Sequence, residues 1–334
     1  MGAPALSLSS LLNACIHSGL RVKGRRLFAT GVAALVAGLA AGCGEQQESR
    51  PSESERPLDP ERFSVMTFNV DRYAYQDRTG DGQAADMKPV EEREAVIALI
   101  AGTSPDMLAL QEMGGGEIFD RFQAELAEAG LRYPFVEMVQ QAHSDLHLAL
   151  LSRYPIVASQ RRTDDRYTMR GEEVRVKRGF LEADIRIHPD VELRLLVAQL
   201  KSKEYHVLGH TEMRRSEARL LNNHVRQALN EAPDRKLLLV GDLNDHLHSA
   251  PVRTLLDGNQ HALVDLRPAD EQGDVWTDFD RESEVYQRFD YLFASPSLAA
   301  DYLPGESTVL RHANHQHASR RRPLFAVFRV AEVE

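Results

Sequence analysis

The sequence predicts an α/β fold in which two β-sheets pack against each other and helices lie on the outside. From Phe63 onward, short apolar stretches typical of strands alternate with stretches of helical periodicity. The strand-like stretches outnumber the helical ones, which favours two packed sheets over a doubly wound parallel sheet. No repeat or low-complexity tract interrupts this pattern. One domain over residues 62–331 is therefore the simplest partition.

In the first half of this domain, two strands alternate with two helices. Residues 63–70 alternate between apolar and polar, as a half-buried strand does. Residues 90–101 have helical spacing with acids in the first turn, which suits a helix N-terminus. Residues 107–111 form a short apolar stretch that predicts a buried strand. Residues 118–130 predict an amphipathic helix closed by a glycine.

The second half is dominated by strands. One long helix is predicted over residues 212–228, and a fully apolar strand at 236–240 follows it and leads into Gly241 and Asp242. The other strands are predicted at residues 146–151, 180–187, 193–200, 291–294 and 324–330.

Composition narrows the class of protein. The apolar fraction of 43% is near the globular norm, so the domain has enough apolar residues for a core. The net charge of -10 argues against a general nucleic-acid coat protein, although a local basic groove is compatible with an acidic body. The two cysteines, Cys15 and Cys43, both precede the domain. The sequence therefore predicts no disulfide framework and no cysteine-based metal site within it.

The N-terminus has the features of an export signal. Residues 27–42 are apolar and rich in small residues, follow a basic stretch, and are shorter than the ~20 residues of a membrane-spanning helix. The stretch ends at Ala40, Ala41, Gly42 and Cys43, which resembles a bacterial lipobox with alanine in the usual leucine position. Residues 1–43 are therefore predicted to be a signal segment, with Cys43 as the lipidated residue.

Other kinds of export signal remain open at this point. A plain signal peptide and an uncleaved anchor are the alternatives to a lipobox, and Arg25 and Arg26 resemble a twin-arginine signal. Residues 44–61 are rich in Glu, Ser, Pro and Gln and predict a disordered tether. Glycine rather than aspartate follows Cys43, so we expect a periplasmic or cell-surface lipoprotein, with the outer membrane favoured.

Polar residues at strand ends are the strongest sign of function. Asn69, Glu112, Asp242, Asn244 and Asp290 each lie at the end of an apolar strand or in the turn beside it. Taken singly, such a residue is more often a turn former or a helix cap. Together, strand ends on one edge of a sandwich can converge, and carboxylate and amide oxygens are the ligands that Mg²⁺ or Mn²⁺ prefers.

The sequence motifs around these positions resemble those of the endonuclease/exonuclease/phosphatase superfamily, and the resemblance extends over the whole domain. That superfamily includes apurinic endonucleases, pancreatic-type deoxyribonucleases, sphingomyelinases and inositol-phosphate phosphatases. The resemblance implies a four-layer α/β/β/α sandwich of two mixed sheets flanked by helices. The residues that carry it are Thr67-Phe68-Asn69, Leu110-Gln111-Glu112, Leu151-Ser152-Arg153-Tyr154-Pro155, Gly241-Asp242-Leu243-Asn244 and Arg288-Phe289-Asp290-Tyr291.

The resemblance also implies a role for each of these residues. Glu112 is expected to bind a divalent metal, Mg²⁺ or Mn²⁺, with Asn69 beside it. Asp242 is expected to orient the attacking water, and Asn244 to contact the phosphate. Asp290 is expected to hold a catalytic histidine. In such a site the metal neutralises developing charge while a positioned base activates water.

Two positions depart from the family pattern. The final Ser-Asp-His stretch of the family is here Ser319, Arg320 and Arg321, and a guanidinium with a pKa above ~12 is not a general base near neutral pH. Gln199 stands where relatives commonly have a histidine, and glutamine does not carry a proton. Two proton-handling positions are therefore missing.

Three explanations for the departures stay open. His317 lies four residues before Arg321 and is a candidate to replace the lost histidine on Asp290. Alternatively, Arg320 to Arg322, with Arg321 as the candidate site residue, clamp an anionic substrate, since Arg binds phosphate in a bidentate fork; an ordinary solvated run is the other reading of three adjacent arginines. Arg178, in the basic segment 164–179, is a second candidate phosphate contact, although that segment is equally an ordinary solvated hairpin. The third explanation is loss of hydrolysis.

The sequence therefore predicts an exported, divalent-metal-dependent phosphoesterase acting on a phosphate-ester substrate. The alternative is a catalytically impaired family member that binds metal or phosphate. Nucleic acid, a lipid headgroup and a small molecule all remain possible substrates, because a fold does not select among them. The membrane is an expected partner through the N-terminal lipid anchor, and no protein partner is inferred.

Overall fold

The structure is a computed structural model that describes residues 57–142, 144–257, 262–311 and 315–330, without the side chains of 315 and 316. These residues lie within one compact unit, Pro51–Glu334. The predicted signal segment 1–43, with Cys43, and residues 44–56 of the predicted tether lie outside the described residues. Within the described ranges, no helix has both the length and the apolar composition needed to span a membrane.

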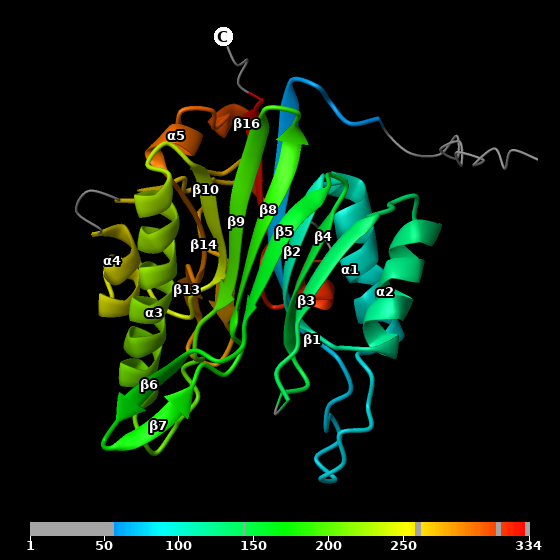
Figure 1. Cartoon of the computed structure of the whole chain (residues 1–334). Coiled ribbons are helices and arrows are strands. Elements are labelled where there is room, and N and C mark those ends of the chain that lie inside the picture. The colour runs from blue at the N-terminus through cyan, green and yellow to red at the C-terminus, as the bar shows by residue number, and fades with distance from the viewer. Residues whose placement is uncertain (1–56, 143, 258–261, 312–314, 331–334) are drawn as a thin grey trace, which may run out of the picture. The chain divides into compact units, whose positions relative to one another are not determined.

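Two six-stranded sheets form the two inner layers (Figure 1). The first sheet has the order β15-β16-β1-β2-β4-β3, in which β1 and β2 are parallel and the other pairs are antiparallel. Its strands are β1 (Arg62–Tyr73), β2 (Met107–Met113), β3 (Phe135–Val139), β4 (His147–Ser152), β15 (Thr308–Val309) and β16 (Leu324–Arg329).

The second sheet has the order β11-β14-β10-β9-β8-β5, in which only β9 and β10 are parallel. Its strands are β5 (Ile156–Arg162), β8 (Phe180–His188), β9 (Val191–Gln199), β10 (Lys236–Asp242), β11 (Val264–Asp265) and β14 (Asp290–Ala294). Two short hairpins stand apart from the sheets, β6 (Arg166–Met169) with β7 (Glu172–Arg175), and β12 (Asp278–Asp280) with β13 (Val285–Gln287).

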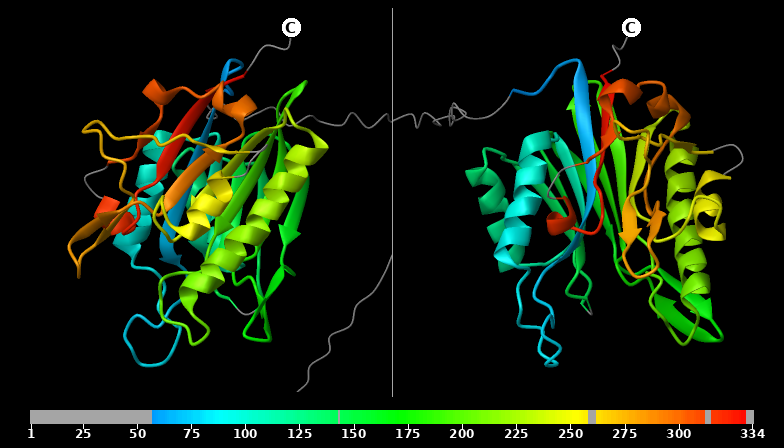
Figure 2. Two further views of the ribbon diagram at one scale, coloured as in Figure 1. Left: turned by 90° about the vertical axis from the view of Figure 1, so that its left-hand side faces the viewer. Right: turned by 180° about the vertical axis from the view of Figure 1, so that it is seen from behind.

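Helices cover the outer face of each sheet (Figures 1 and 2). Helices α1 (Val90–Thr103) and α2 (Glu117–Glu128) cover the first sheet, and α3 (His210–Glu231) and α4 (Ala250–Leu256) cover the second. The short elements are α5 (Pro296–Ala299), the 3-10 helix η2 (Pro304–Glu306) and α6 (His315–Ala318). The layers therefore follow the order α/β/β/α, and the predicted four-layer sandwich is confirmed.

Alternation along the strands divides the core into three parts. In β1, Val65 packs between the two sheets, whereas the next residue, Met66, packs toward α1 and α2. Likewise Leu195 of β9 packs between the sheets, and Leu196 packs toward α3 and α4. Successive strand residues point to opposite faces, so strands buried on both faces need nearly continuous apolar sequence. That is why these central strands were predictable.

The outer strands were not predicted, and β5 shows why. Five of its seven residues are exposed, because β5 lies at the edge of its sheet. Its sequence from Ser159 to Arg162 is polar throughout. An edge strand needs no apolar alternation, since its stability comes from pairing with β8.

Candidate functional site

The polar residues predicted from the strand ends meet at one edge of the sandwich. Strands β1 and β2 are parallel and place Asn69 opposite Gln111, next to Glu112. Strands β9 and β10 are also parallel and place Gln199 opposite Asp242. Strand β14 runs antiparallel to β10, so its first residue, Asp290, pairs with Asp242 at the same edge. The topology therefore brings together residues that are far apart in the sequence.

A glycine sets the position of Asp242. Gly241 has φ +135°, and a Cβ placed there would lie 1.9 Å from the carbonyl oxygen of Ala198. Any side chain would force β10 away from β9. Gly241 thus permits the close approach that holds Asp242 beside Gln199.

The backbone takes an unusual conformation at Glu112, at an irregularity within β2, and at Asn244, in the turn after β10. Glu112 has φ 64° and Asn244 has φ 52°, in the left-handed region that non-glycine residues seldom occupy. The backbone N–H of Asn244 donates to Asp242 Oδ1 at 3.0 Å, and its Nδ2 donates to the carbonyl of Leu200 at 3.0 Å. These bonds compensate for the unfavourable conformation and hold Asn244 against the centre.

Asn69 joins the residues predicted to lie on the metal side. Its Nδ2 donates to Asp242 Oδ2 at 2.9 Å and to Glu112 Oε1 at 3.2 Å. The Nε2 of Gln199 donates to Glu112 Oε1 at 2.7 Å, and the backbone N–H of Arg72 donates to Glu112 Oε2 at 3.1 Å. Both oxygens of the Glu112 carboxylate therefore already accept hydrogen bonds from nitrogen donors.

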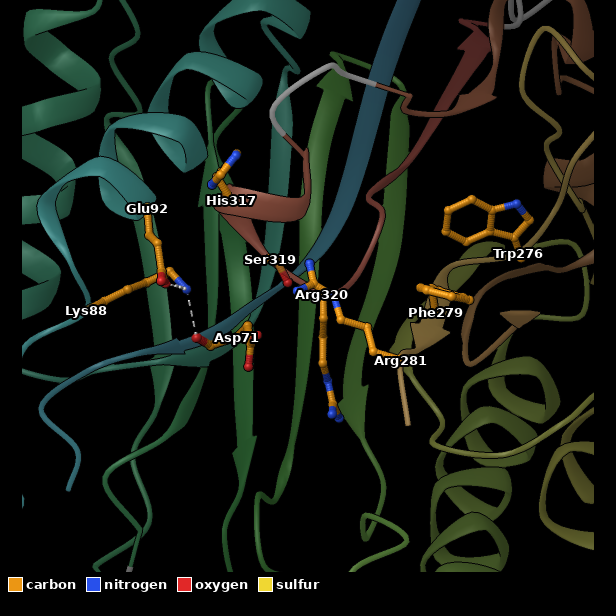
Figure 3. A pocket seen from close by; sticks show the side chains of 9 residues that line it. All are labelled: Asp71, Lys88, Glu92, Trp276, Phe279, Arg281, His317, Ser319 and Arg320. Carbon is orange, nitrogen blue, oxygen red and sulfur yellow. Dashed lines mark hydrogen bonds and ion pairs between the residues drawn. The ribbon is translucent and has the colours of Figure 1, made fainter. Parts of the chain in front are cut away.

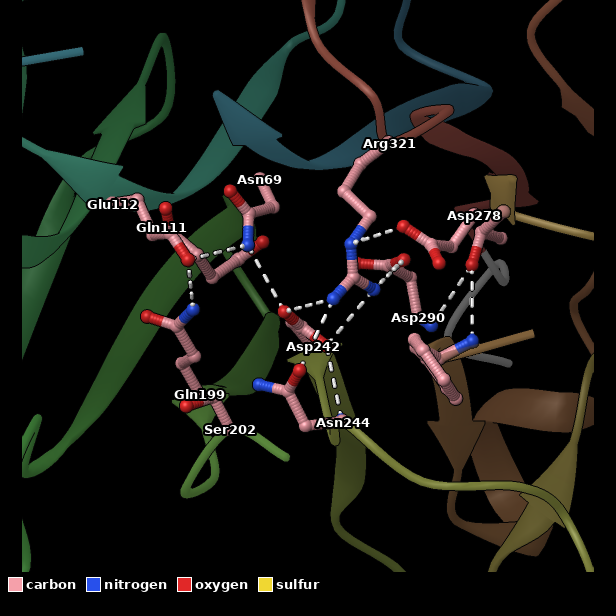
Figure 4. A network of polar contacts seen from close by, with 12 residues as sticks. Asn69, Gln111, Glu112, Gln199, Ser202, Asp242, Asn244, Asp278, Asp290 and Arg321 are labelled. Carbon is pink, nitrogen blue, oxygen red and sulfur yellow. Dashed lines mark hydrogen bonds and ion pairs between the residues drawn. The ribbon is translucent and has the colours of Figure 1, made fainter. Parts of the chain in front are cut away.

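Arg321 occupies the middle of the acidic cluster (Figure 4). Its Nη1 donates to Asp242 Oδ1 at 3.2 Å and to Asp290 Oδ2 at 3.1 Å, and its Nη2 donates to Asn244 Oδ1 at 3.1 Å. Its Nε lies 3.2 Å from Asp278 Oδ1, an ion pair without hydrogen-bond alignment. Arg321 is 2% exposed.

The charges in this cluster shift one another's pKa values. Burial raises the pKa of Asp290 to about 7; Arg321 opposes this rise and Asp242 adds to it. Burial also raises the pKa of Asp242, again against the effect of Arg321. Burial acts to lower the pKa of Arg321, but its three aspartate neighbours raise it above its ordinary value. The guanidinium therefore stays charged, while Asp242 and Asp290 resist full ionisation.

The structure corrects the expectation that Arg321 clamps an anionic substrate. Its Nη atoms are bonded to Asp242, Asp290 and Asn244, and the side chain is closed off from solvent. The physical reason is the negative charge beneath it, since buried carboxylates need a cationic partner. Arg321 is the counter-ion of the acidic cluster.

His317 does not approach Asp290. It is exposed on α6 and lines a cavity with Ser319 and Arg320. Among the described residues, the side chain that contacts the Asp290 carboxylate is Arg321. The expectation that His317 replaces the family's histidine on Asp290 therefore has no geometric support, because Arg321 already occupies that place.

Arg178 lies behind Gln199. Its Nε donates to Gln199 Oε1 at 3.2 Å, and its Nη1 bonds to Ser144 Oγ. Burial lowers the pKa of Arg178, and Glu112 acts against this effect. Arg178 thus orients Gln199 toward Glu112. The rest of its segment forms the β6–β7 hairpin, in which Arg166 pairs with Glu173.

Asp278 is a site residue that the sequence did not indicate. It is 4% exposed on the short strand β12 and forms an isolated bridge with Arg321. The segment around it has no regular apolar pattern that would predict a strand. The one sequence feature that could have indicated Asp278 is its position directly after Trp276 and Thr277, a motif that fits the family.

A second group of residues that the sequence did not indicate lies on α3 and holds the loops beside the site. The Nε of Arg214 donates to Asp245 Oδ2 at 2.8 Å, and its Nη1 donates to the carbonyl of Lys201 at 3.0 Å. Glu217 Oε2 accepts from the backbone N–H of Lys201 at 2.6 Å, and burial raises the pKa of Glu217 to about 7. The available sequence signal for these contacts was a pair of charged residues, Arg214 and Glu217, three positions apart on the apolar face of the predicted helix.

The fit of a divalent metal can be judged from the donors present. Both Glu112 oxygens accept from nitrogen donors, and the neighbouring Asp242 is held by Asn69 and Arg321. Within the described residues, no three His, Cys, Asp or Glu side chains are grouped so as to hold a metal ion. In this arrangement the residues do not fit Mg²⁺ or Mn²⁺, which need free oxygen ligands.

Comparisons with known proteins agree with this architecture. The model of the Endonuclease/Exonuclease/phosphatase family matches residues 66–306. No curated protein matches the sequence. Among solved structures, the sphingomyelinase C of Streptomyces griseocarneus is 17% identical with a TM-score of 0.58, and the match covers 80% of this chain and 99% of that one.

Two further structures share the fold. The human Nocturnin catalytic domain with bound sulfate is 17% identical with a TM-score of 0.58, and the match covers 81% of this chain and 95% of that one. Truncated Caenorhabditis elegans TDP2 is 16% identical with a TM-score of 0.53, and the match covers 80% of this chain and 98% of that one. The family match spans most of the chain, and the fold and the strand-end residues agree with it. The chain belongs to the endonuclease/exonuclease/phosphatase family.

Proposed function

We propose that this protein binds a phosphate ester at the rim of the family's site without hydrolysing it. The observation that carries this proposal is the position of Arg321 among Asp242, Asn244 and Asp290. Family chemistry needs a group there that accepts and releases a proton, and a guanidinium stays protonated near neutral pH. The pKa of Arg321 is raised further by its aspartate neighbours, against the lowering effect of burial.

Two further features support binding without turnover. Gln199 donates a hydrogen bond of 2.7 Å to Glu112. Relatives commonly have a titratable histidine at this position, whereas glutamine is neutral and does not carry a proton. At the rim of the centre, the side chain of Arg320 is 66% exposed, and Arg281 is exposed nearby, lining the same cavity. Exposed guanidinium groups are suited to phosphate recognition.

A hydrolysis assay tests the proposal. The purified protein is incubated with bis-p-nitrophenyl phosphate or plasmid DNA, with Mg²⁺ or Mn²⁺ and with EDTA. We expect no turnover above that of the metal alone, and no difference between the wild type, Glu112→Ala and the control Glu117→Ala. Glu117 is exposed at the start of α2 and is a matched control for loss of a carboxylate. Calorimetry on the same sample should show binding of glycerol 2-phosphate.

A metal-dependent phosphoesterase is the second candidate. It is favoured by the convergence of Asn69, Glu112 and Asp242, residue types of the family's metal side, at one edge of the sandwich; a metal ion there would have to displace the hydrogen bonds that Asn69 and Gln199 donate to Glu112. Loss of an essential acid or base typically reduces the rate about 10²–10⁴-fold, so a slow enzyme is compatible with Arg321. Metal-dependent turnover that is lost in Glu112→Ala and kept in Glu117→Ala would establish this candidate in place of the first.

We also propose that the protein is exported and anchored to a membrane by a lipid on Cys43. The support is the sequence of residues 21–43, in which a basic stretch precedes an apolar one and a lipobox-like ending. We expect radioactive palmitate to label the protein in a bacterial host, and Cys43→Ser to abolish the label. Cys15→Ser is the matched control and should keep it. Equal labelling of the wild type and Cys43→Ser would show that Cys43 is not the anchor.

A further inference from the structure

A cavity of about 220 Å³ opens beside the Arg321 centre (Figure 3). Its walls include Trp276 and Phe279 from the β12 side, and Lys88 from the segment before α1. Arg281 and Arg320 also line it. Aromatic and cationic side chains thus face one small space next to the site.

The local backbone explains why Arg320 and Arg321 separate. Arg321 forms an isolated bridge with Asp278, whereas Arg320 stands at a bend directly before it, so the two side chains leave the backbone in different directions. Ser319 anchors the stretch, because its Oγ donates to the carbonyl of Asn69 at 2.8 Å and accepts from the backbone N–H of Arg321 at 2.9 Å. Arg321 therefore enters the acidic centre, and Arg320 turns toward the cavity.

The aromatic wall is held in place by the β12–β13 hairpin. Phe279 pairs in register with Tyr286, and their ring centroids are 4.5 Å apart. The ring of Tyr286 also lies 4.7 Å from that of Trp276, and the guanidinium of Arg322 lies 4.1 Å from the Trp276 ring. The two rings that line the cavity are therefore positioned before any ligand arrives.

The cationic side chains outnumber the acidic ones around the cavity. The charged residues, histidine aside, are Lys88, Arg281 and Arg320 against Asp71 and Glu92. Lys88 is 2% exposed; its Nζ donates to the carbonyl of Asp71 at 3.0 Å and forms an ion pair with Glu92 at 3.0 Å. Arg320 lies 3.7 Å from Asp278, whose carboxylate also pairs with Arg321. An anionic group would complement this wall.

We propose that this cavity binds an aromatic phosphate monoester, with its ring against Trp276 and Phe279 and its phosphate at Arg281 and Arg320. Stacking on aromatic rings and guanidinium-phosphate bonds together recognise such a ligand. The volume is below the roughly 300–1,000 Å³ of common small-molecule sites, so the ligand has one ring system and one phosphate. This inference rests on the proposed binding of a phosphate ester and adds the class of ester.

The sequence contains a single tryptophan, Trp276, which makes the test direct. The purified full chain is titrated with phenyl phosphate while its tryptophan fluorescence is followed, and calorimetry measures the affinity. Phenol, glycerol 2-phosphate and AMP are titrated in parallel. We expect saturable quenching by phenyl phosphate, with an affinity at least tenfold above that for phenol, glycerol 2-phosphate or AMP. Tighter binding of AMP than of phenyl phosphate would overturn the assignment to an aromatic phosphate monoester.

Three variants locate the site. We expect Arg320→Gln to weaken phenyl phosphate at least tenfold, and Phe279→Leu to weaken it while leaving glycerol 2-phosphate unchanged. Arg253→Gln is the control, because Arg253 is 63% exposed on α4 and pairs with Asp257. The wild-type affinity should be kept there.

The outcomes separate this inference from the proposed function. Equal affinities for phenyl phosphate and glycerol 2-phosphate would overturn the aromatic site and leave phosphate-ester binding intact. Binding of phenyl phosphate that Arg320→Gln does not weaken would place the ligand elsewhere and also overturn it. Absence of binding by every phosphate would refute both.

Discussion

Replacing Arg321 by methionine is expected to lower the free energy of unfolding by about 3–5 kcal/mol at pH 8, because it leaves buried carboxylates without their cation. Methionine is of similar length and fills the space without the charge. Asp242, Asp278 and Asp290 are each at most 4% exposed and face Arg321, so water cannot replace the guanidinium. Urea unfolding of the wild type and the variant measures the difference.

The same variant should be less destabilised at pH 5.5. Burial raises the pKa of Asp290 from 3.8 to about 7, against Arg321, so between these pH values the folded state holds a proton that the unfolded state has released. Stability from this group therefore falls as the pH rises through that window. Without Arg321 the pKa rises further, and the window extends above pH 7.

Two results would contradict this account of Arg321. One is an equal loss of stability at both pH values, which would mean that Arg321 stabilises the fold through packing and not through its charge. The other is a loss no larger than that of Arg253→Met, an exposed arginine on α4 whose replacement should stay within about 0.5 kcal/mol. Either result would remove the counter-ion role.

The double variant Arg320→Asp/Arg321→His is expected to gain metal-dependent hydrolysis. A histidine at position 321 would stand beside Asp290, Asp242 and Asn244, which now contact Arg321. It would restore a group that transfers protons and would release Asp242 from its ion pair. A positioned acid or base contributes about 10²–10⁴-fold, so we expect a gain of about 10²-fold over the wild type, limited by Gln199.

The measurement is the initial rate on bis-p-nitrophenyl phosphate with Mn²⁺. Arg321→Gln is the control, because it removes the guanidinium without supplying a titratable group and should stay inactive. The triple variant with Gln199→His should be faster again. A folded double variant with no more turnover than Arg321→Gln would show that the altered final motif is not what prevents hydrolysis.

The convergence of Asn69, Glu112, Asp242, Asn244 and Asp290 could be predicted from the sequence. Asn69, Glu112 and Asp242 lie in the last part of their strands, Asn244 follows β10 and Asp290 begins β14. These strands are buried on both faces, and a continuous apolar sequence predicts such strands. Once the strands pair, their ends share one edge of the sandwich. The meeting of these residues therefore follows from local pattern and topology, whereas their assignment to a metal side is what the family resemblance implies.

The behaviour of the final arginines could not be predicted in this way. Arg320, Arg321 and Arg322 are identical in type and adjacent in sequence, yet Arg320 is exposed while Arg321 pairs with Asp242 and Arg322 with Asp270. A sequence pattern assigns the three residues the same properties. Their different environments depend on the bridge between Arg321 and Asp278. Asp278 lies in a short strand that no apolar pattern predicts.

The sequence by itself predicted two packed sheets with helices outside and strand ends that meet at one edge, because local periodicity reflects burial and strand pairing. Its resemblance to the family implied the four-layer order and the loss of two proton-handling groups, because the family's motifs show which residue types are expected at those positions. Only the tertiary structure decided that Arg321 neutralises the acidic cluster and that Arg320 faces a cavity with Trp276. The charge balance of a buried site depends on which distant carboxylates surround each cation, and those neighbours exist only after the chain has folded.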